Sequence, residues 1–173
     1  EDLDVIVKSG CLENEAMVLD LKDYQRALVW IDGRFSAILS GGLYAAWTAF
    51  RKVEVQMVDA REVRFEHPDL NVILKAPGCA EHLEIVTVDE GHVGVYFRNG
   101  QYAQTLGAGK YAFWKGMDRV KVVQVNLRDL TLDVAGQEIM TSDKVTLRLN
   151  AAVTYRVADA RLAVEKTDDA KQA

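Results

Sequence analysis

The sequence carries one stretch twice: ALVWIDGRFSAILSGGLYAAWTAFRKVEVQMVDARE at residues 27–62 and GVYFRNGQYAQTLGAGKYAFWKGMDRVKVVQVNLRD at residues 94–129. A shift of 67 positions aligns the two copies without a gap. Ten positions are then identical, where a random overlay of this length gives about two or three. The identical pairs are Gly33/Gly100, Leu39/Leu106, Gly42/Gly109, Tyr44/Tyr111, Ala45/Ala112, Trp47/Trp114, Val53/Val120, Val55/Val122, Val58/Val125 and Arg61/Arg128. This self-similarity predicts two related structural modules in tandem.

The shared residues fall where a β-hairpin places strict demands on the backbone. Asp32-Gly33 and Asn99-Gly100 both suit tight type I′ turns, because both central positions of such a turn need positive φ. Ser40-Gly41-Gly42 and Gly107-Ala108-Gly109 mark a second turn in each copy. A strand-like alternation of apolar and polar residues follows. In the second copy this alternation steps out of phase at Val123, which predicts a β-bulge.

The last part of the chain shows the longest alternation of apolar and polar side chains. Its apolar members are Val145, Leu147, Leu149, Ala151, Val153, Tyr155 and Val157. Apolar residues at period two predict a long strand with one buried face. Asp159 then fits a helix N-cap, and residues 5–7 fit a short strand near the N-terminus. We therefore predict a β-rich α+β fold made of two tandem, related, small antiparallel modules and a C-terminal helix. Residues 1–85 would form the first module and residues 86–173 the second.

Composition and charge bound the possible functions. The 173 residues are 49% apolar and 27% charged, which is usual for a globular protein. The formal net charge of −5 argues against a nucleic-acid partner and gives no support to electrostatic docking on anionic lipid. No segment reaches the roughly 20 apolar residues of a membrane-spanning helix. The longest uncharged run, residues 35–50, suits two strands and a turn, with a shallow membrane-dipping loop as the alternative.

The cysteines and the chain ends give two further expectations. Cys11 and Cys79 fit neither a metal site nor a redox pair, so we predict two free thiols in a reducing compartment, with a disulfide as the alternative. The chain begins at Glu1 without a methionine and stops within a helix-like pattern, which indicates an excised piece. No signal peptide is visible.

No motif predicts catalysis or metal binding. His67, His82 and His92 lack the spacing of metal ligands. His67-Pro68-Asp69 copies the tripeptide of J-domain co-chaperones, but that motif needs two flanking helices and here stands between strand-like segments. Gly107-Ala108-Gly109-Lys110 lacks the spacing of a phosphate-binding loop. We therefore predict a protein that is not an enzyme, with no catalytic, cofactor-binding or metal-binding residue.

Several short motifs recur in a fixed order in the second half of the chain. These are FRNGQY (97–102), TLGAGKY (105–111), MDRV (117–120), VNLR (125–128), LDV (132–134), QEIMTSDKVT (137–146) and VTYRVAD (153–159). In their order and spacing, residues 88–164 resemble the stomatin/prohibitin/flotillin (SPFH, or Band 7) superfamily, and most closely its slipin, or stomatin-like, branch. The chain departs from the usual family pattern at Ala108 and at Ala135-Gly136, where family members usually carry a proline. It also has the first module where slipins usually have a hydrophobic membrane segment.

The resemblance implies a mixed α+β domain with a bent antiparallel sheet, followed by a longer helical region. It further implies homo-oligomers that associate with membrane lipid and organise membrane microdomains or regulate membrane proteases and channels. Family members commonly partner with small membrane proteins of the NfeD type. The resemblance implies no cofactor and no catalytic residue, and the charge gives no reason to expect a nucleic-acid partner.

These expectations lead to one preferred function and one candidate contact surface. We predict a non-enzymatic, membrane-associated oligomeric scaffold, itself soluble over these residues, whose anchor lies before Glu1 or is absent. The alternative is a soluble β module that binds a single partner protein or a small ligand. The candidates for an apolar rim that faces lipid or a neighbouring subunit are Tyr44, Trp47, Tyr111, Phe113 and Trp114. The same aromatic residues could instead fill the core of each module.

Overall fold

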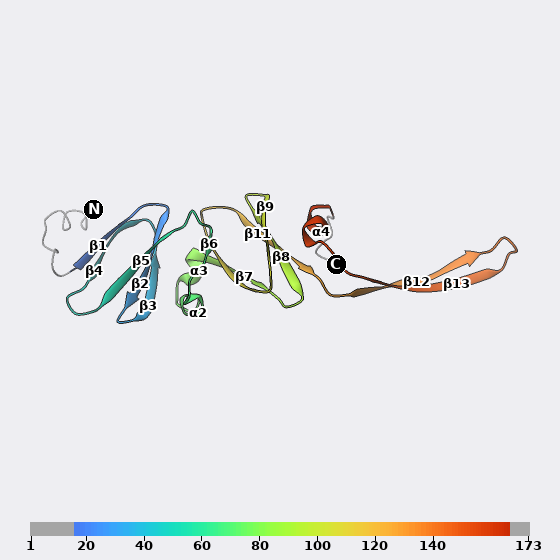
Figure 1. The fold of residues 1–173 in the computed structure, drawn as a ribbon, viewed down its shortest axis with the longest axis horizontal. Helices are drawn as coiled ribbons and strands as arrows, with labels where there is room; N and C mark the ends of the chain where they lie inside the picture. Colours follow the sequence, from blue (N-terminus) through green and yellow to red (C-terminus); the bar gives the residue numbers. More distant parts are fainter. Residues whose placement is uncertain (1–15, 167–173) are drawn as a thin grey trace. The chain divides into compact units, whose positions relative to one another are not determined.

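The computed structural model of the chain describes residues 16–166. The chain divides into two compact units, one of residues 1–86 and 111–119 and the other of residues 87–110 and 120–173 (Figure 1). The strand predicted at residues 5–7 and the thiol of Cys11 lie outside the described residues.

The first unit is built from short antiparallel sheets and two single-turn helices. In chain order its elements are β1 (Ala16–Leu21), β2 (Gln25–Ile31), β3 (Arg34–Leu39), β4 (Gly42–Trp47), β5 (Val53–Asp59), β6 (Arg64–Phe65), α2 (Leu70–Ile73), α3 (Cys79–His82) and the greater parts of β7 (Leu83–Val88) and β10 (Gly109–Trp114). β2 is the central strand of a sheet of order β3-β2-β5, and β1 pairs with β4. A third sheet has the order β6-β10-β7.

The core of the first unit includes residues that arrive late in the sequence. Trp114 and Ala112 of β10 pack with Leu28, Ile73 and Leu83 in one buried cluster. Because residues 111–119 help to complete this core, the unit is not a continuous segment of the chain. The domain boundary expected after residue 85 stays a prediction.

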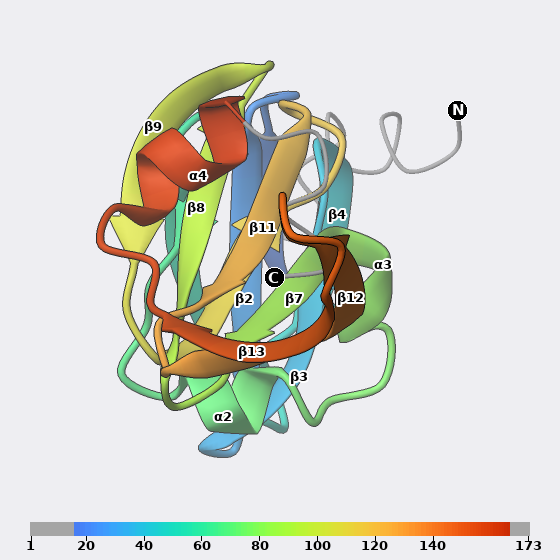
Figure 2. The same cartoon turned by 90° about the vertical axis from the view of Figure 1, so that its right-hand side faces the viewer.

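The second unit contains the remaining strands and the C-terminal helix. These are β8 (His92–Arg98), β9 (Gln101–Leu106), β11 (Val120–Asn126), β12 (Leu130–Met140), β13 (Thr146–Tyr155) and α4 (Ala160–Lys166). β8 is central in a sheet of order β11-β8-β9, and α4 lies against this sheet (Figure 2). The backbone N–H of Leu162 donates to Asp159 Oδ1 at 3.1 Å, so the helix start predicted at Asp159 is confirmed.

The sheets β3-β2-β5 and β9-β8-β11 have the same strand pairing at an offset of 67 residues. The pairs Ala27↔Leu39 and Gly94↔Leu106 correspond, and the register breaks after Val29 in one sheet and after Tyr96 in the other. The turn residues correspond too. Asp32 and Gly33 have φ of 52° and 74°, and Asn99 and Gly100 have φ of 53° and 83°, the left-handed region that a type I′ turn needs.

One local expectation is wrong. β8 and β11 pair without a register shift from Val120↔Arg98 to Asn126↔His92. The strand therefore has no bulge at Val123, and the change of phase in the sequence only makes neighbouring apolar side chains point to opposite faces. The larger prediction is confirmed, because the described chain is a β-rich α+β fold with several small antiparallel sheets and a C-terminal helix.

Candidate membrane and assembly surfaces

The described residues offer no metal centre and no spanning helix. Between residues 16 and 166, no three His, Cys, Asp or Glu side chains come together as they would around a metal ion. None of the helices described is long and apolar enough to cross a membrane. The remaining candidates are exposed apolar surfaces, because large surfaces of this kind mark places where a protein or a membrane binds.

The first such surface, which we call the aromatic tip, lies at the end of β4 and in the loop that follows. Trp47 is 61% exposed and Phe50 is 96% exposed, while Tyr44 is half-buried. Arg51 and Lys52, both exposed, follow Phe50 directly. The aromatic tip therefore combines two large apolar side chains with two cations over six residues.

The end of the loop is tied to the neighbouring hairpin turn. The N–H of Lys52 donates to Asp32 Oδ1 at 3.0 Å, and the N–H of Asp32 donates to the carbonyl of Lys52 at 2.8 Å. Lys52 Nζ lies 2.6 Å from Glu54 Oε1, and this hydrogen bond and the charge of Glu54 raise the pKa of Lys52. The turn at Asp32 thus holds the start of β5, directly after the exposed Phe50.

The second copy does not form an aromatic tip, and this corrects part of the predicted rim. Phe113 and Trp114 are fully buried, and the ring of Trp114 lies 4.8 Å from that of Phe65. Tyr111 is half-buried, with the Arg64 guanidinium 5.1 Å above its ring. β10 has a neighbour on both edges, whereas β4, among the strands described, pairs with β1 alone. Trp114 therefore belongs to the core of the first unit, and Phe113, which is also buried, is not part of an exposed rim.

Phe50 was missed by sequence reasoning, although a signal for it was present. It is the last residue of the uncharged run 35–50 and directly precedes Arg51-Lys52. An aromatic residue beside cations in a loop is a feature of membrane-interface segments. The counterpart of Phe50 in the second copy, Met117, instead packs against the buried core of the first unit.

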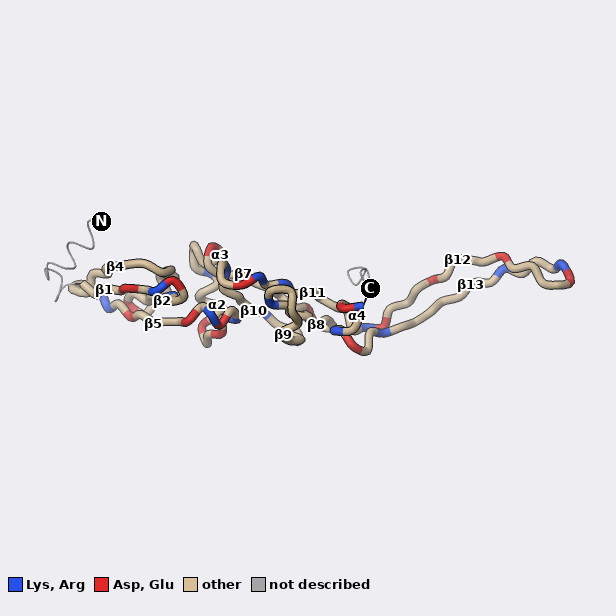
Figure 3. Tube along the Cα trace, turned by 90° about the horizontal axis from the view of Figure 1, so that it is seen from above, with Lys and Arg blue, Asp and Glu red and all other residues tan. Residues whose placement is uncertain are grey.

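The second surface is one face of the ribbon formed by β12 and β13. Cross-strand pairs such as Leu132↔Val153 and Ile139↔Leu147 align apolar side chains with each other, and charged residues are sparse along both strands (Figure 3). All ten residues of β13 are exposed. The prediction of a buried face on this strand is therefore wrong for the described residues, because β12 and β13 form a sheet of only two strands.

A further site lines a cavity in the first unit and brings together His67-Pro68-Asp69. This tripeptide stands between β6 and α2, without the pair of flanking helices that the co-chaperone motif needs. The other two histidines lie elsewhere. His82 Nδ1 is 3.3 Å from Ser40 Oγ, and burial together with Arg26 lowers the pKa of His82. Burial also raises the pKa of the Cys79 thiol.

Comparison with known protein families matches residues 86–173, half of the chain, to the SPFH domain / Band 7 family. The chain belongs to this family. Within the Band 7 family, it is 32% identical to mouse stomatin over 79 residues and 39% identical to a stomatin homologue of Pyrococcus horikoshii over 75 residues. An uncharacterized protein of Archaeoglobus fulgidus is 39% identical over 82 residues.

These relatives support the stomatin-like branch of the Band 7 family. The matches cover 46%, 43% and 47% of this chain, and only 28%, 27% and 32% of mouse stomatin, the Pyrococcus protein and the Archaeoglobus protein. Proteins of this family are generally non-enzymatic scaffolds associated with membranes. The chain therefore carries part of what a whole Band 7 protein contains.

Proposed function

We propose that this chain works as a non-enzymatic oligomeric scaffold of the stomatin type at a membrane surface. The observation that carries the proposal is the aromatic tip, where Trp47 and Phe50 are exposed beside Arg51 and Lys52. Tryptophan and other amphipathic aromatic side chains favour the headgroup region of a bilayer. Neighbouring cations add attraction to anionic headgroups.

The charge of the chain makes insertion more important than electrostatics in this proposal. The formal net charge is −5, so the chain as a whole is repelled by an anionic surface, and only the local cations oppose that repulsion. Full burial of one large apolar side chain contributes about 1.5–3 kcal/mol. Trp47 and Phe50 together can therefore outweigh a weak long-range repulsion.

A flotation experiment with lipid vesicles tests membrane binding. The double variant Trp47→Ser/Phe50→Ser should lose about tenfold or more in partitioning, because both side chains supply the apolar area. The matched control is Val72→Ser/Ile85→Ser, which removes two exposed apolar side chains outside the tip and should bind like the unaltered chain. Equal binding by both double variants would refute a role for the aromatic tip.

Self-association is the second part of the proposal, and the apolar face of the β12–β13 ribbon supports it. A two-stranded ribbon is at best marginally stable alone, and exposed strand edges and faces pair readily with identical ones. Two copies placed face to face would bury the same residues on both sides, as a two-fold interface requires. We propose that a second copy of this chain covers the ribbon.

Sedimentation velocity over a range of concentrations tests self-association. The variant Leu132→Thr/Leu147→Thr places β-branched residues, which suit strands, at these two positions and should raise the dissociation constant about tenfold or more. Ala152→Thr, which lies opposite Asp133 on the other face, is the control. A chain that stays monomeric at every concentration would contradict this part and favour the alternative, a soluble β module that binds one partner protein or a small ligand.

The proposal of partners other than lipid and a second copy of this chain is supported by family membership alone. A membrane protein of the NfeD type, a membrane protease or a channel would be regulated by being held near the assembled scaffold. Crosslinking in membranes that contain one such partner, with the aromatic-tip variant as the comparison, would test this part. Loss of crosslinks in that variant supports recruitment at the membrane.

A further inference from the structure

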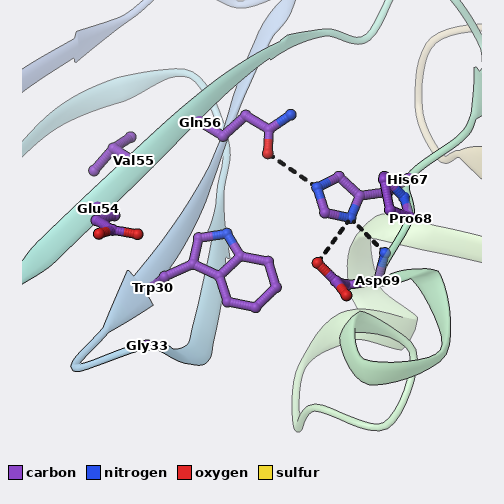
Figure 4. A pocket seen from close by; sticks show the side chains of 8 residues that line it. All are labelled: Trp30, Gly33, Glu54, Val55, Gln56, His67, Pro68 and Asp69. Carbon is purple, nitrogen blue, oxygen red and sulfur yellow. Dashed lines mark hydrogen bonds and ion pairs between the residues drawn. The ribbon is translucent and has the colours of Figure 1, made fainter.

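A cavity of about 630 Å³ lies in the first unit, and neither Trp47 nor Phe50 of the aromatic tip lines it. Three elements supply its walls: β2 with its turn, β5, and the segment that leads into α2 (Figure 4). The lining residues are Trp30, Gly33, Glu54, Val55, Gln56, His67, Pro68 and Asp69. The cavity therefore combines an indole ring, two carboxylates and a histidine, with neither Lys nor Arg among its lining residues.

The histidine and the amide in this cavity bond to each other and to the backbone. The N–H of Asp69 donates to His67 Nδ1 at 3.0 Å, which makes that nitrogen an acceptor. The proton of the neutral ring is then on Nε2, which donates to Gln56 Oε1 at 2.9 Å. Neither ring nitrogen of His67 remains to bind a ligand. The wall that His67 offers is its aromatic ring, roughly parallel to the Trp30 ring at 6.0 Å.

The two carboxylates are available to a positive charge. Asp69 precedes α2 but makes no side-chain cap hydrogen bond to it, and Asp69 Oδ2 lies 4.0 Å from His67 Nδ1. Glu54 is paired with Lys52, but both side chains are exposed, and exposed ion pairs are weak and exchange readily. The cavity is therefore negative on two sides.

The carbon surface of the cavity selects what kind of cation fits. Figure 4 looks onto the face of the Trp30 indole, with Glu54 and Val55 on one side and the chain Gln56–His67–Asp69 on the other. The face of an indole attracts cations more strongly than any other aromatic face. Val55 and Pro68 add apolar lining.

We propose that this cavity binds a methylated ammonium group, of the kind that choline carries. A Ca²⁺ or Mg²⁺ ion would need six or more oxygen ligands, whereas the two carboxylates that line the cavity supply four oxygens. A primary ammonium would be held by hydrogen bonds to these carboxylates and would make no use of the indole face. A quaternary ammonium needs no hydrogen bond and is held by aromatic faces and nearby negative charge. The ligand is then either free choline or the headgroup of a phosphatidylcholine lipid.

The second copy lacks this combination of side chains, so the site belongs to the first copy alone. At an offset of 67, Phe97 stands in the place of Trp30 and Lys121 in the place of Glu54. Phe97 lies edge-on to Tyr102 at 6.4 Å, much as Trp30 lies edge-on to Phe35 at 5.0 Å, and both rings pack against the core of their own unit. A cationic side chain at position 121 would repel the same ligand.

The test is an NMR titration of the whole chain with choline chloride, followed at the indole N–H of Trp30. The comparison ligand is 3,3-dimethylbutan-1-ol, which has the shape of choline without its charge, and sodium chloride controls for ionic strength. Choline should shift the Trp30 signal with saturation, and the alcohol should bind at least about threefold more weakly. Equal responses to choline and the alcohol, or no response to choline, would overturn the proposal.

A variant without the two carboxylate charges distinguishes their contribution to choline binding from that of the Trp30 ring. Glu54→Gln/Asp69→Asn should weaken choline binding at least about threefold and preserve the shape of the cavity. The control Glu62→Gln removes an exposed carboxylate that does not line it. Unchanged affinity in the double variant would overturn the assignment, provided that its spectrum shows the native fold.

Vesicles distinguish the two sources of the ligand. A Trp30 shift with phosphatidylcholine but not with phosphatidylglycerol assigns the lipid headgroup, whereas a shift with free choline alone assigns the soluble compound. The aromatic-tip variant should bind choline normally. Loss of membrane binding and loss of choline binding are therefore separate results.

Discussion

Trp47 and Trp114 occupy the same position in two copies of one strand pattern, yet their surroundings are opposite. Trp47 is 61% exposed at the end of β4, and Trp114 is 1% exposed in β10. The strands, the register and the turns of the two copies correspond at an offset of 67. The comparison teaches that the two copies share the pairing of their hairpin strands, while neighbouring elements, such as β6 beside β10, decide whether an aromatic residue stabilises a core or forms a surface.

The largest expected effect follows from this pair. Trp114→Ala should lower the free energy of unfolding of the first unit by about 3–5 kcal/mol, because it empties a fully packed site. Trp47→Ala should change it by no more than about 0.5 kcal/mol. Urea unfolding followed by the remaining tryptophans measures both, since all three tryptophans lie in the first unit. Similar losses in both variants would contradict the comparison.

A milder replacement sharpens this result. Trp114 Nε1 is buried and has no hydrogen-bond partner in the described part of the chain. Trp114→Phe removes this donor and keeps an aromatic ring, so it should destabilise the first unit much less than Trp114→Ala.

The second largest effect is expected at the central strands. Ala27 of β2 corresponds to Gly94 of β8, and a Cβ on Gly94 would lie 2.9 Å from both Val122 Cγ1 and Val88 Cγ2. Gly94→Ala should therefore cost about 1–3 kcal/mol through overpacking. Hydrogen exchange of β8 and β11 measures the loss. Unchanged protection would mean that the second unit tolerates an alanine at position 94, as the first unit does at Ala27.

A smaller effect is expected where a shared arginine has different neighbours. The Arg61 guanidinium lies 4.3 Å above the ring of Tyr24, and the corresponding Arg128 fills the space beside Gly91 and donates to the carbonyl of Glu90. Tyr24→Leu keeps apolar area but removes the ring face, so only a slight loss of urea resistance is expected. Arg128→Lys should have a similarly small effect, because a lysine can reach the same carbonyl. A large loss in either variant would show that these contacts carry more stability than exposed pairs usually do.

The smallest effect should appear only in acid, and only in the first unit. Burial and Arg26 lower the pKa of His82 below its ordinary value of 6.5, so the unfolded chain binds the proton more tightly than the folded one. The stability associated with His82 is complete above pH 6.5 and decreases as the pH falls below it. His82→Gln should reduce this pH dependence, measured by urea midpoints between about pH 5 and about pH 8. An identical slope in both chains would refute the effect.

Turns and helix starts could be predicted from the sequence better than which side chains other elements would bury. Asp32-Gly33 and Asn99-Gly100 were identified as hairpin turns because few residues other than Gly, Asn and Asp adopt positive φ readily. The helix start at Asp159 was readable from capping chemistry alone. Burial of Trp114 depends on β6 and the segments around α2 and α3, which are far away in the chain, so periodicity could not reveal it. The predicted buried face of β13 was wrong, because alternation of apolar and polar residues shows which face is apolar but not whether another element covers that face.

The candidate sites show the same difference between residues that the local sequence indicates and residues that only the folded chain brings together. Trp47 was proposed from its aromatic character, and Phe50 was missed because the run that ends with it was read as two strands and a turn. The cavity beside His67 could not be inferred, because Trp30, Glu54 and His67 come together only through strand pairing and the return of the chain after β5.

Because the first unit is made of two separate chain segments, a gene for the first copy alone would not encode the whole unit. The chain leaves this unit after residue 86, returns for residues 111–119 and leaves again. A gene truncated or recombined at the obvious border between the two copies would encode a first half without the indole of Trp114 at its centre. The first copy of the repeat therefore depends for its core on a segment that the second copy supplies.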